Sequence, residues 1–392
     1  MHLTLHLTKG CNMACDYCYS QPRMAPALSF ETGRKALMLG ARLSPQSCGI
    51  VFFGGEPLLH KALITSLVAE ARAMERDGRG RFHFKLTTNG LLLDDEFLRF
   101  SVEHDVLVAM SFDGVRPAHD AHRRLVDGSP SYDILLPHLR RLLAVRPYAT
   151  VLTVVNPDTA RHLSASIEFL LEQGARHLIV SLNYAGSWTA ADFRILRAEY
   201  EKLADLYVKW SQAERKFYLS PFEVKLSSHI NRHDQHRERC ELAARQVSVD
   251  PDGYVFPCVQ FAHTGRESTF CIGHVDSGID EVARSRIRAQ AKKESEICQD
   301  CAVKDRCNHT CGCLNWQTTG DINGISPVLC EHERMLIPIA DRVGQRLYRG
   351  RVPAFLHKHY NAAYPVLSLL EEAADSIAWV QSKRTTETDK AS

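Results

Sequence analysis

Three cysteines near the N-terminus, Cys11, Cys15 and Cys18, are the residues of this sequence best suited to carry chemistry. They follow the spacing C-x3-C-x2-C, and no fourth cysteine lies nearby. A closed zinc site or a fully coordinated four-iron cluster needs four protein ligands, so three thiolates on such a cluster leave one iron free for a substrate or cofactor. The alternatives are three buried free cysteines, or half of a zinc site completed from elsewhere. The cluster is favoured because Gly10 and Tyr17 also stand where a tight cluster loop needs them.

The triad resembles the cluster loop of the radical S-adenosylmethionine (AdoMet) enzymes, which follows the pattern C-x3-C-x-aromatic-C. A second motif supports the resemblance, because the apolar segment 50–53 runs into a Gly-Gly-Glu-Pro turn. Glycine pairs are common between a strand and a helix, so this turn supports the resemblance only because it follows the cysteine triad. In the family, the turn presents backbone polar groups to the amine of AdoMet. The resemblance therefore implies that Gly54, Gly55, Glu56 and Pro57 bind AdoMet.

The elements that must position these residues alternate between strand and helix. Apolar periodicity predicts six strands separated by helices, with Ser29 as the N-cap of the first helix. This alternation is typical of an α/β fold with a parallel sheet, in which the chemistry lies at the C-terminal ends of the strands. The resemblance implies a partial (β/α)6 barrel. Strands are expected at 1–7, 50–53, 82–90, 106–111, 149–155 and 177–182, and helices at 30–43, 58–74, 94–103, 132–145 and 161–172.

The end of the fourth predicted strand carries a third motif, which starts with Ser111 and Asp113. It resembles the S-x-D-G…H-D-x-x-R…G-x-x-S-x-D stretch of the subgroup that modifies peptides and proteins. In that subgroup, residues at this strand end lie near the ribose of AdoMet, which implies such a role for Ser111 and Asp113. For Asp120 and Arg123, further along the motif, capping roles in a polar loop are the simpler interpretation.

Most of the other cysteines lie in the C-terminal half of the chain. Seven of them match the spacing of the SPASM domain, which carries auxiliary iron–sulfur clusters behind a radical AdoMet barrel. Zinc ribbons also use C-x2-C pairs, so zinc is the alternative for this half considered alone. The cysteine triad near the N-terminus favours iron over zinc in the C-terminal half. The resemblance implies that Cys298, Cys301, Cys307 and Cys330 hold the second auxiliary cluster, and that Cys240, Cys258 and Cys311 bind the first.

The first auxiliary cluster thus lacks a fourth matched ligand. Relatives with a full set take a cysteine shortly before the first motif cysteine, but no cysteine lies between residues 48 and 240. Cys48 is predicted to be a small buried hydrophobe and Cys271 a strand residue, whereas the Cys313 thiol lies beside a matched ligand. The site is either open or completed by one of five residues, and the sequence does not decide between them. These residues are His233, Asp234, His236, Cys271 and Cys313.

The domain organisation follows from these motifs. We expect the barrel at 1–185, a helical bridge at 186–239 with a helix at about 191–215, and the SPASM domain at 240–335. C-terminal helices are expected to make up 336–381, with one helix at about 331–348, which begins in the last residues of the SPASM domain, and another at about 366–381. A disordered tail is expected at 382–392. Since the sequence begins with its first predicted strand, no peptide-recognition module is expected before the barrel.

The composition is that of an ordinary globular protein, with 45% hydrophobic and 24% charged residues among 392. The net charge of +2 and the scattered basic residues predict no nucleic-acid partner. The sequence shows neither a signal peptide nor the apolar run of about 20 residues that a membrane span needs. We therefore expect a cytoplasmic protein without membrane contact. Thiols stay reduced there, so thirteen cysteines indicate metal rather than disulfides.

The resemblance also implies the chemistry. In the family, one electron from the reduced cluster cleaves AdoMet to methionine and a 5′-deoxyadenosyl radical, which takes hydrogen from an unactivated C–H bond. We predict a maturase that installs an oxidative cross-link in a ribosomally made precursor peptide. Its cofactors would be AdoMet and three four-iron clusters, with the two auxiliary clusters as electron acceptors. An external donor such as flavodoxin or ferredoxin would supply electrons. No catalytic base is identified.

Three alternatives to the cross-link remain. A sulfatase-type maturase would make formylglycine, but the best-known members carry an acidic base directly after the second motif cysteine, where this sequence has Val259. We therefore expect no formylglycine, although Asp252 or His263 could supply the base. A maturase for a quinone cofactor or quinoprotein is the second alternative. A non-catalytic iron–sulfur or zinc protein is least favoured, because electron carriers use closed four-cysteine sites.

Overall fold

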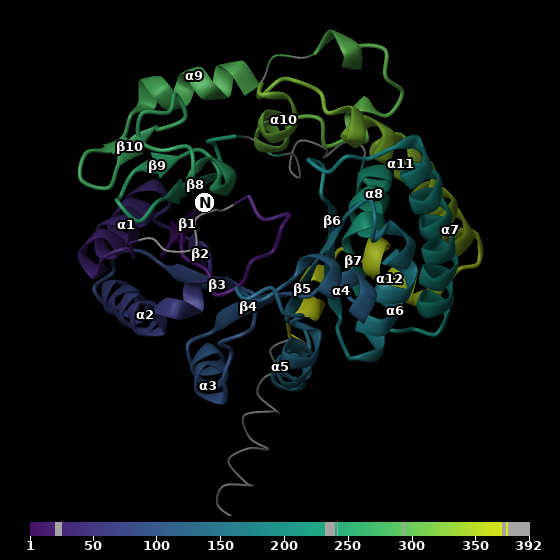
Figure 1. Cartoon of the computed structure of the whole chain (residues 1–392), viewed down its shortest axis with the longest axis horizontal. Coiled ribbons are helices and arrows are strands. Elements are labelled where there is room, and N and C mark those ends of the chain that lie inside the picture. Colours follow the sequence, from purple (N-terminus) through teal and green to yellow (C-terminus); the bar gives the residue numbers. More distant parts are fainter. Residues whose placement is uncertain are drawn as a thin grey trace, which may run out of the picture.

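A computed structural model describes residues 1–19, 26–231, 240, 242–291, 293, 295–370 and 374. Nine strands form one sheet in the order β7-β6-β5-β4-β3-β2-β1-β8-β9, with helices along its outer side (Figure 1). Strands β1 to β6 pair in parallel with their neighbours in sequence, which confirms the predicted α/β fold. The strands are β1 (His2–His6), β2 (Cys48–Phe53), β3 (Phe82–Thr88), β4 (Val106–Ser111), β5 (Thr150–Val155), β6 (His177–Leu182), β7 (Tyr218–Leu219), β8 (Gln246–Val249) and β9 (Val255–Phe256).

Five of the six helices that the structure describes in the N-terminal half lie close to their predicted positions, whereas α4 (Arg116–His122) was not predicted. Helix α1 starts after Ser29, whose Oγ accepts a hydrogen bond from the backbone N–H of Thr32 at 3.0 Å. Two predicted helices begin with a short 3-10 turn, η1 (Pro57–His60) before α2 and η2 (Ala160–His162) before α6. The helices of this half are α1 (Phe30–Leu43), α2 (Lys61–Arg76), α3 (Asp95–Glu103), α4 (Arg116–His122), α5 (Tyr132–Val145) and α6 (Leu163–Glu172).

The C-terminal half is joined to the barrel through the sheet itself. Strand β8 pairs in parallel with β1, with Leu3 opposite Val247 and Leu5 opposite Val249. Strand β9 then pairs with β8 in antiparallel fashion. Figure 1 shows this part of the chain, in green, beside β1. The sequence did not predict this pairing, which fixes the position of Cys258, just after β9, relative to the loop that follows β1.

The predicted bridge continues the barrel. Helix α7 (Ala190–Gln212) is followed by β7, which pairs with β6, and by α8 (Ser220–Ile230). Helix α11 (Pro327–Arg349) packs on α7 and α8, where the Lys225 ammonium and the Glu333 carboxylate form a buried ion pair at 2.6 Å. Because α11 begins at Pro327, earlier than predicted, Cys330 lies in its first turn.

Some predictions for the C-terminal half are wrong, and others concern residues that the structure does not describe. Cys271 lies in irregular chain before the short strand β10 (Gly273–His274), which pairs with β11 (Gly278–Ile279), and not in a strand. Helix α12 (Pro353–Tyr360) was not predicted. The polar segment 232–239, most of the predicted helix 366–381 and the tail 382–392 are outside the described residues. The domain boundaries stay predictions.

The core lies between the sheet and its helices. Alternate residues of β2, Cys48, Ile50 and Phe52, are at most 1% exposed, as a half-buried strand requires. The burial of Cys48 confirms its interpretation as a small hydrophobe. Within the part of the chain that the structure describes, no helix has the length and apolar character needed to cross a membrane.

Candidate active site and metal centres

The cysteine triad lies in the loop directly after β1, at the C-terminal end of the strand, and the Gly-Gly-Glu-Pro turn is bonded to the start of that loop. The backbone N–H of Gly55 donates to the Thr8 carbonyl at 2.8 Å, and the N–H of Glu56 donates to the Gly10 carbonyl at 2.9 Å. A Cβ on Gly55 would lie 1.9 Å from the Gly10 oxygen, so only glycine permits this approach. Gly54 adopts φ +136°, which also favours glycine.

Replacing Gly55 by alanine should push the turn away from the triad loop. We expect a loss of about 3 kcal/mol in unfolding free energy, the upper end for overpacking, and about four fewer irons per chain if the triad holds a four-iron cluster. Chemical denaturation and iron analysis measure the two effects. Gly350→Ala, where the nearest atom to a new Cβ is 3.1 Å away, is the control. Unchanged stability and iron content in Gly55→Ala would contradict this account of the turn.

The Glu56 carboxylate holds this turn against the end of β3. It is fully buried; Oε1 accepts hydrogen bonds from the Leu58 N–H at 2.9 Å and the Thr88 hydroxyl at 2.8 Å, and Oε2 accepts from the Asn89 N–H at 2.7 Å. Burial raises the pKa of Glu56, and these three bonds oppose the increase. Because the side chain is occupied internally, the backbone of the turn is the part left to meet a ligand. Pro57 opens η1.

Asn89 connects this arrangement to the triad loop. Its Nδ2 donates to Asn12 Oδ1 at 2.8 Å and lies 3.7 Å from Cys11 Sγ. The backbone N–H of Met13 also points at the same sulfur, at 3.4 Å. Asn89 was predicted only as part of the strand segment 82–90, without a role in the site. Its site role depends on the end of β3 meeting the triad loop, which no local pattern reveals.

The end of β4 supports the aromatic residue of the triad loop. The Tyr17 hydroxyl donates to Asp113 Oδ2 at 2.9 Å and accepts from the Arg123 guanidinium at 2.7 Å, while Asp113 Oδ1 accepts from the Val154 N–H at 2.9 Å. Burial raises the pKa of Asp113, and the Arg123 charge opposes that increase. Both carboxylate oxygens are therefore occupied within the protein. Ser111 ends β4 and is half-buried.

The two other residues of this motif have different roles. Asp120 Oδ1 accepts from the backbone N–H groups of Ser131 and Tyr132, at 3.0 and 2.9 Å, so its capping role is confirmed. The capping interpretation is wrong for Arg123, which is 5% exposed and reaches Tyr17 beside the triad. A buried arginine whose charge reaches the Cys15 thiol adds positive charge where a cluster would place negative charge.

A first group of cysteines lies where the C-terminal half meets the barrel. Cys258 follows β9, and its sulfur accepts from Gln246 Nε2 at 3.4 Å. The sulfur atoms of Cys311 and Cys313 are 3.5 Å apart, at the start of α10 (Gly312–Thr319). Side-chain hydrogen bonds also link Cys313 to Cys258 and Cys311 to Cys240. All three cysteines predicted for the first auxiliary cluster thus come together, with Cys313 among them.

The second group lies between η5 (Glu296–Cys298) and the first turn of α11. The Cys330 thiol lies close enough to three other thiols for their charges to interact, those of Cys298, Cys301 and Cys307. Arg334 approaches the Cys301 sulfur at 4.0 Å. Burial raises the pKa of Cys307 to about 12.

The chemistry of the donors fits iron–sulfur clusters. Backbone N–H groups point at sulfur in Cys11, Cys258 and Cys311, and hydrogen bonds of this kind stabilise cluster thiolates. Burial raises the pKa of Cys11 to about 11, so this thiol needs a bound metal to become a thiolate at neutral pH. Among the described residues, no three His, Cys, Asp or Glu side chains are placed to bind one metal ion.

The triad loop meets the first group of cysteines at Tyr19 and His263. Their ring centroids are 5.9 Å apart. The Tyr19 hydroxyl also lies close enough to the Cys18 and Cys258 thiols for their charges to interact. The His263 ring is hydrogen-bonded to the backbone of Gln260, and burial lowers its pKa. His263 is therefore neutral at pH 7, beside the junction of the two predicted cluster sites.

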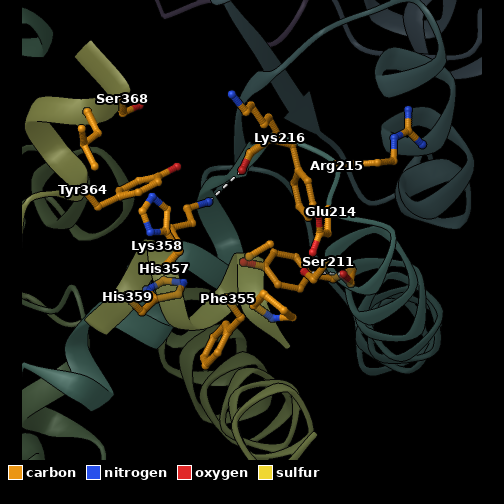
Figure 2. A pocket seen from close by; sticks show the side chains of 15 residues that line it. Ser211, Glu214, Arg215, Lys216, Phe355, His357, Lys358, His359, Tyr364 and Ser368 are labelled. Atoms are coloured by element: carbon orange, nitrogen blue, oxygen red, sulfur yellow. Dashed lines mark hydrogen bonds between the residues drawn. The ribbon is translucent and has the colours of Figure 1, made fainter. Parts of the chain in front are cut away.

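A cavity of about 420 Å³ lies elsewhere, among α7, α12 and the segment before β7 (Figure 2). Lys358 Nζ points across it and donates to the Phe217 carbonyl at 2.7 Å. The neighbouring Tyr218 pairs with His177 at the start of β6. The cavity is thus at the N-terminal end of the strands, opposite the triad, and is not the predicted active site.

Comparisons with known proteins agree with this architecture. A family model of the Radical SAM superfamily matches residues 5–170, and a model of the SPASM iron–sulfur cluster-binding domain matches residues 240–302. The serine-type anaerobic sulfatase-maturating enzyme of Klebsiella aerogenes is 23% identical over 77% of each chain. The cysteine-type enzyme of Clostridium novyi is 23% identical over 64% of this chain and 71% of that protein.

Two solved structures share the fold. The structure of anSMEcpe with bound AdoMet and the Cp18Cys peptide has a TM-score of 0.76 at 18% identity, and covers 89% of this chain and 99% of that one. Streptococcus suis SuiB bound to its precursor peptide SuiA has a TM-score of 0.59 at 15% identity, and covers 84% and 75%. At these identities the likeness supports the fold and not a substrate.

Proposed function

The chain is a radical SAM protein with a SPASM iron–sulfur domain, and from this premise we propose that it is a maturase that oxidises a side chain of a peptide or protein. The observation that carries the proposal is the backbone bonding between the triad loop and the turn at 54–57. Cys11, Cys15 and Cys18 would hold the radical cluster, and the turn would meet the amine of AdoMet. When bound, these cofactors supply a 5′-deoxyadenosyl radical that removes a hydrogen atom from the substrate.

The protein residues then determine where the remaining electron and proton go. The group of Cys240, Cys258 and Cys311 adjoins the triad loop through Tyr19, which supports the first auxiliary cluster as the nearer electron acceptor. The group that includes Cys330 would hold the second cluster. An external donor such as flavodoxin or ferredoxin would still have to reduce the radical cluster.

The comparisons support formylglycine formation better than the cross-link that the sequence favours, because the sulfatase-maturating enzymes match over more of both chains. In that reaction a thiol side chain loses a hydrogen atom from its β-carbon, an electron to an auxiliary cluster and a proton to a base. Water then converts the thioaldehyde to the aldehyde and releases hydrogen sulfide. A serine side chain gives the aldehyde directly by the same three losses.

His263 is our candidate for the base that this reaction needs. Val259, which follows Cys258, cannot accept a proton, so the base must come from another residue. The His263 ring is neutral because burial lowers its pKa. Its hydrogen bond to the backbone of Gln260 orients the ring, in the way that a catalytic histidine is usually held.

The oxidative cross-link is the second candidate, and Val259 is the observation that favours it. A cross-link also loses a hydrogen atom, an electron to an auxiliary cluster and a proton, but the proton leaves after the new bond has formed and the electron has been lost. The oxidised intermediate is then acidic enough to release its proton to water, so a fixed acidic base beside Cys258 is not needed. SuiB, whose structure includes a precursor peptide, shares the fold with this chain. Both candidates use the same cofactors and the same electron path, so the product decides between them.

The number of bound irons tests the part that both candidates share. Anaerobic reconstitution should give about twelve irons and twelve sulfides per chain, which corresponds to three four-iron clusters. Iron and sulfide analysis together with zinc analysis measures this number. A total near four irons, with zinc in the remainder, would contradict the assignment of the C-terminal cysteines.

A further inference from the structure

We propose that Cys313 is the fourth thiolate of the first auxiliary cluster, beside Cys240, Cys258 and Cys311. This inference rests on the proposed function, which assigns a cluster to that site. The sequence left the fourth ligand undecided among several residues. The contacts within the first group of cysteines now favour one of them.

Cys313 lies among the matched ligands. Its sulfur is 3.5 Å from that of Cys311 and is hydrogen-bonded to Cys258. A distance of 3.5 Å is far longer than the ~2.05 Å of a disulfide, so both cysteines are free thiols available to a metal. Cys313 is 7% exposed, which shields a cluster at this position from solvent.

The local backbone explains how two cysteines so close in sequence can both reach one site. Cys311 is the N-cap of α10 and Cys313 lies in its first turn, so both sulfurs are at the positive end of the helix. Backbone N–H groups of residues 313 and 314 point at the Cys311 sulfur. Between the two cysteines, a Cβ on Gly312 would lie 2.9 Å from the Leu242 side chain. Glycine therefore lets the start of α10 pack closely against the segment that carries Cys240.

The other candidate cysteine has a different partner. The Cys271 thiol donates to the Gly273 carbonyl at 3.6 Å, within its own loop. His233, Asp234 and His236 lie outside the described residues, and the experiment below tests them against Cys313. The four-thiolate site has a functional consequence: it leaves no iron position for a substrate atom. The first auxiliary cluster then accepts an electron without binding the peptide.

The test uses full-length protein in which Cys11, Cys15 and Cys18 are replaced by alanine, so that only auxiliary clusters contribute. This background should bind about eight irons per chain. Adding Cys313→Ala should remove one to four of these irons and produce, after oxidation, the electron paramagnetic resonance signal of a three-iron cluster. Cys271→Ala is the matched control and should leave both readouts unchanged. A small added thiol should restore the four-iron spectrum in Cys313→Ala.

The possible results separate a wrong ligand assignment from the absence of the auxiliary clusters. Full iron content and an unchanged spectrum in Cys313→Ala would overturn the proposal, and the same measurements on Asp234→Ala, His233→Ala and His236→Ala would then identify the ligand. If the background protein binds no iron, the auxiliary clusters themselves are absent, and the proposed function fails together with this inference. Cys313→Val, which fills the buried position with a side chain that has no donor atom for iron, provides the same readout if the alanine variant does not fold.

Discussion

Replacing Cys11, Cys15 and Cys18 together by alanine is expected to abolish 5′-deoxyadenosine formation and to remove about four irons per chain. The physical reason is that these thiols are the only cysteines in the loop after β1, and no local fourth ligand can retain a cluster there. Without that cluster, AdoMet has neither an iron to chelate nor an electron source. Chromatography of the reaction under strong reductant measures the nucleoside, and the iron analysis is made on the same sample.

The control for this experiment is Cys48→Ala. Cys48 is buried in β2 and lies away from both C-terminal groups of cysteines, so its loss should affect stability and leave the nucleoside yield unchanged. The triple variant should still bind the irons of the C-terminal half. Continued release of 5′-deoxyadenosine by the triple variant would refute the assignment of the triad.

Much of the barrel could be predicted because its signals are local. Strand β4, helix α5 and strand β6 begin and end at the predicted residues, since each has a clear period and is bounded by polar residues or turns. The spacing of the cysteines is also a local signal. It indicated Cys240, Cys258 and Cys311 as one group, and the structure brings these three cysteines together with Cys313.

The contacts that depend on distant parts of the chain could not be predicted. Strand β8 has four residues, too few for a period to be recognised, and its pairing with β1 joins residues more than 240 positions apart. Arg123 was interpreted as a capping residue because its neighbours are polar, yet its partner is Tyr17. The close contact of Cys313 with Cys258 likewise depends on the packing of α10 near β9. Such pairings are set by the tertiary fold rather than by propensity.

Incubating the reconstituted protein with a cysteine-type sulfatase peptide, AdoMet and reductant is expected to produce formylglycine, and His263→Ala should reduce its yield by about 10²- to 10⁴-fold. The reason is that the electron lost to the auxiliary cluster must be matched by a proton lost from the thiol, and Val259 cannot accept that proton. Trapping the aldehyde with a hydrazine identifies the product, because other eliminations also lower the peptide mass.

The His263→Ala variant should separate proton transfer from radical formation. AdoMet binding and 5′-deoxyadenosine release depend on the triad and the turn, so both should persist while the aldehyde is lost. His83→Ala, on the exposed face of β3, is the matched histidine control. Since burial lowers the pKa of His263, the wild-type rate should decline as the pH falls, with a midpoint below the ordinary histidine value of about 6.5. A hydrazone yield unchanged in His263→Ala would place the base elsewhere. No hydrazone from either a cysteine-type or a serine-type peptide would exclude the sulfatase-type reaction, and the oxidative cross-link, which needs no base beside Cys258, would then be the better account of Val259.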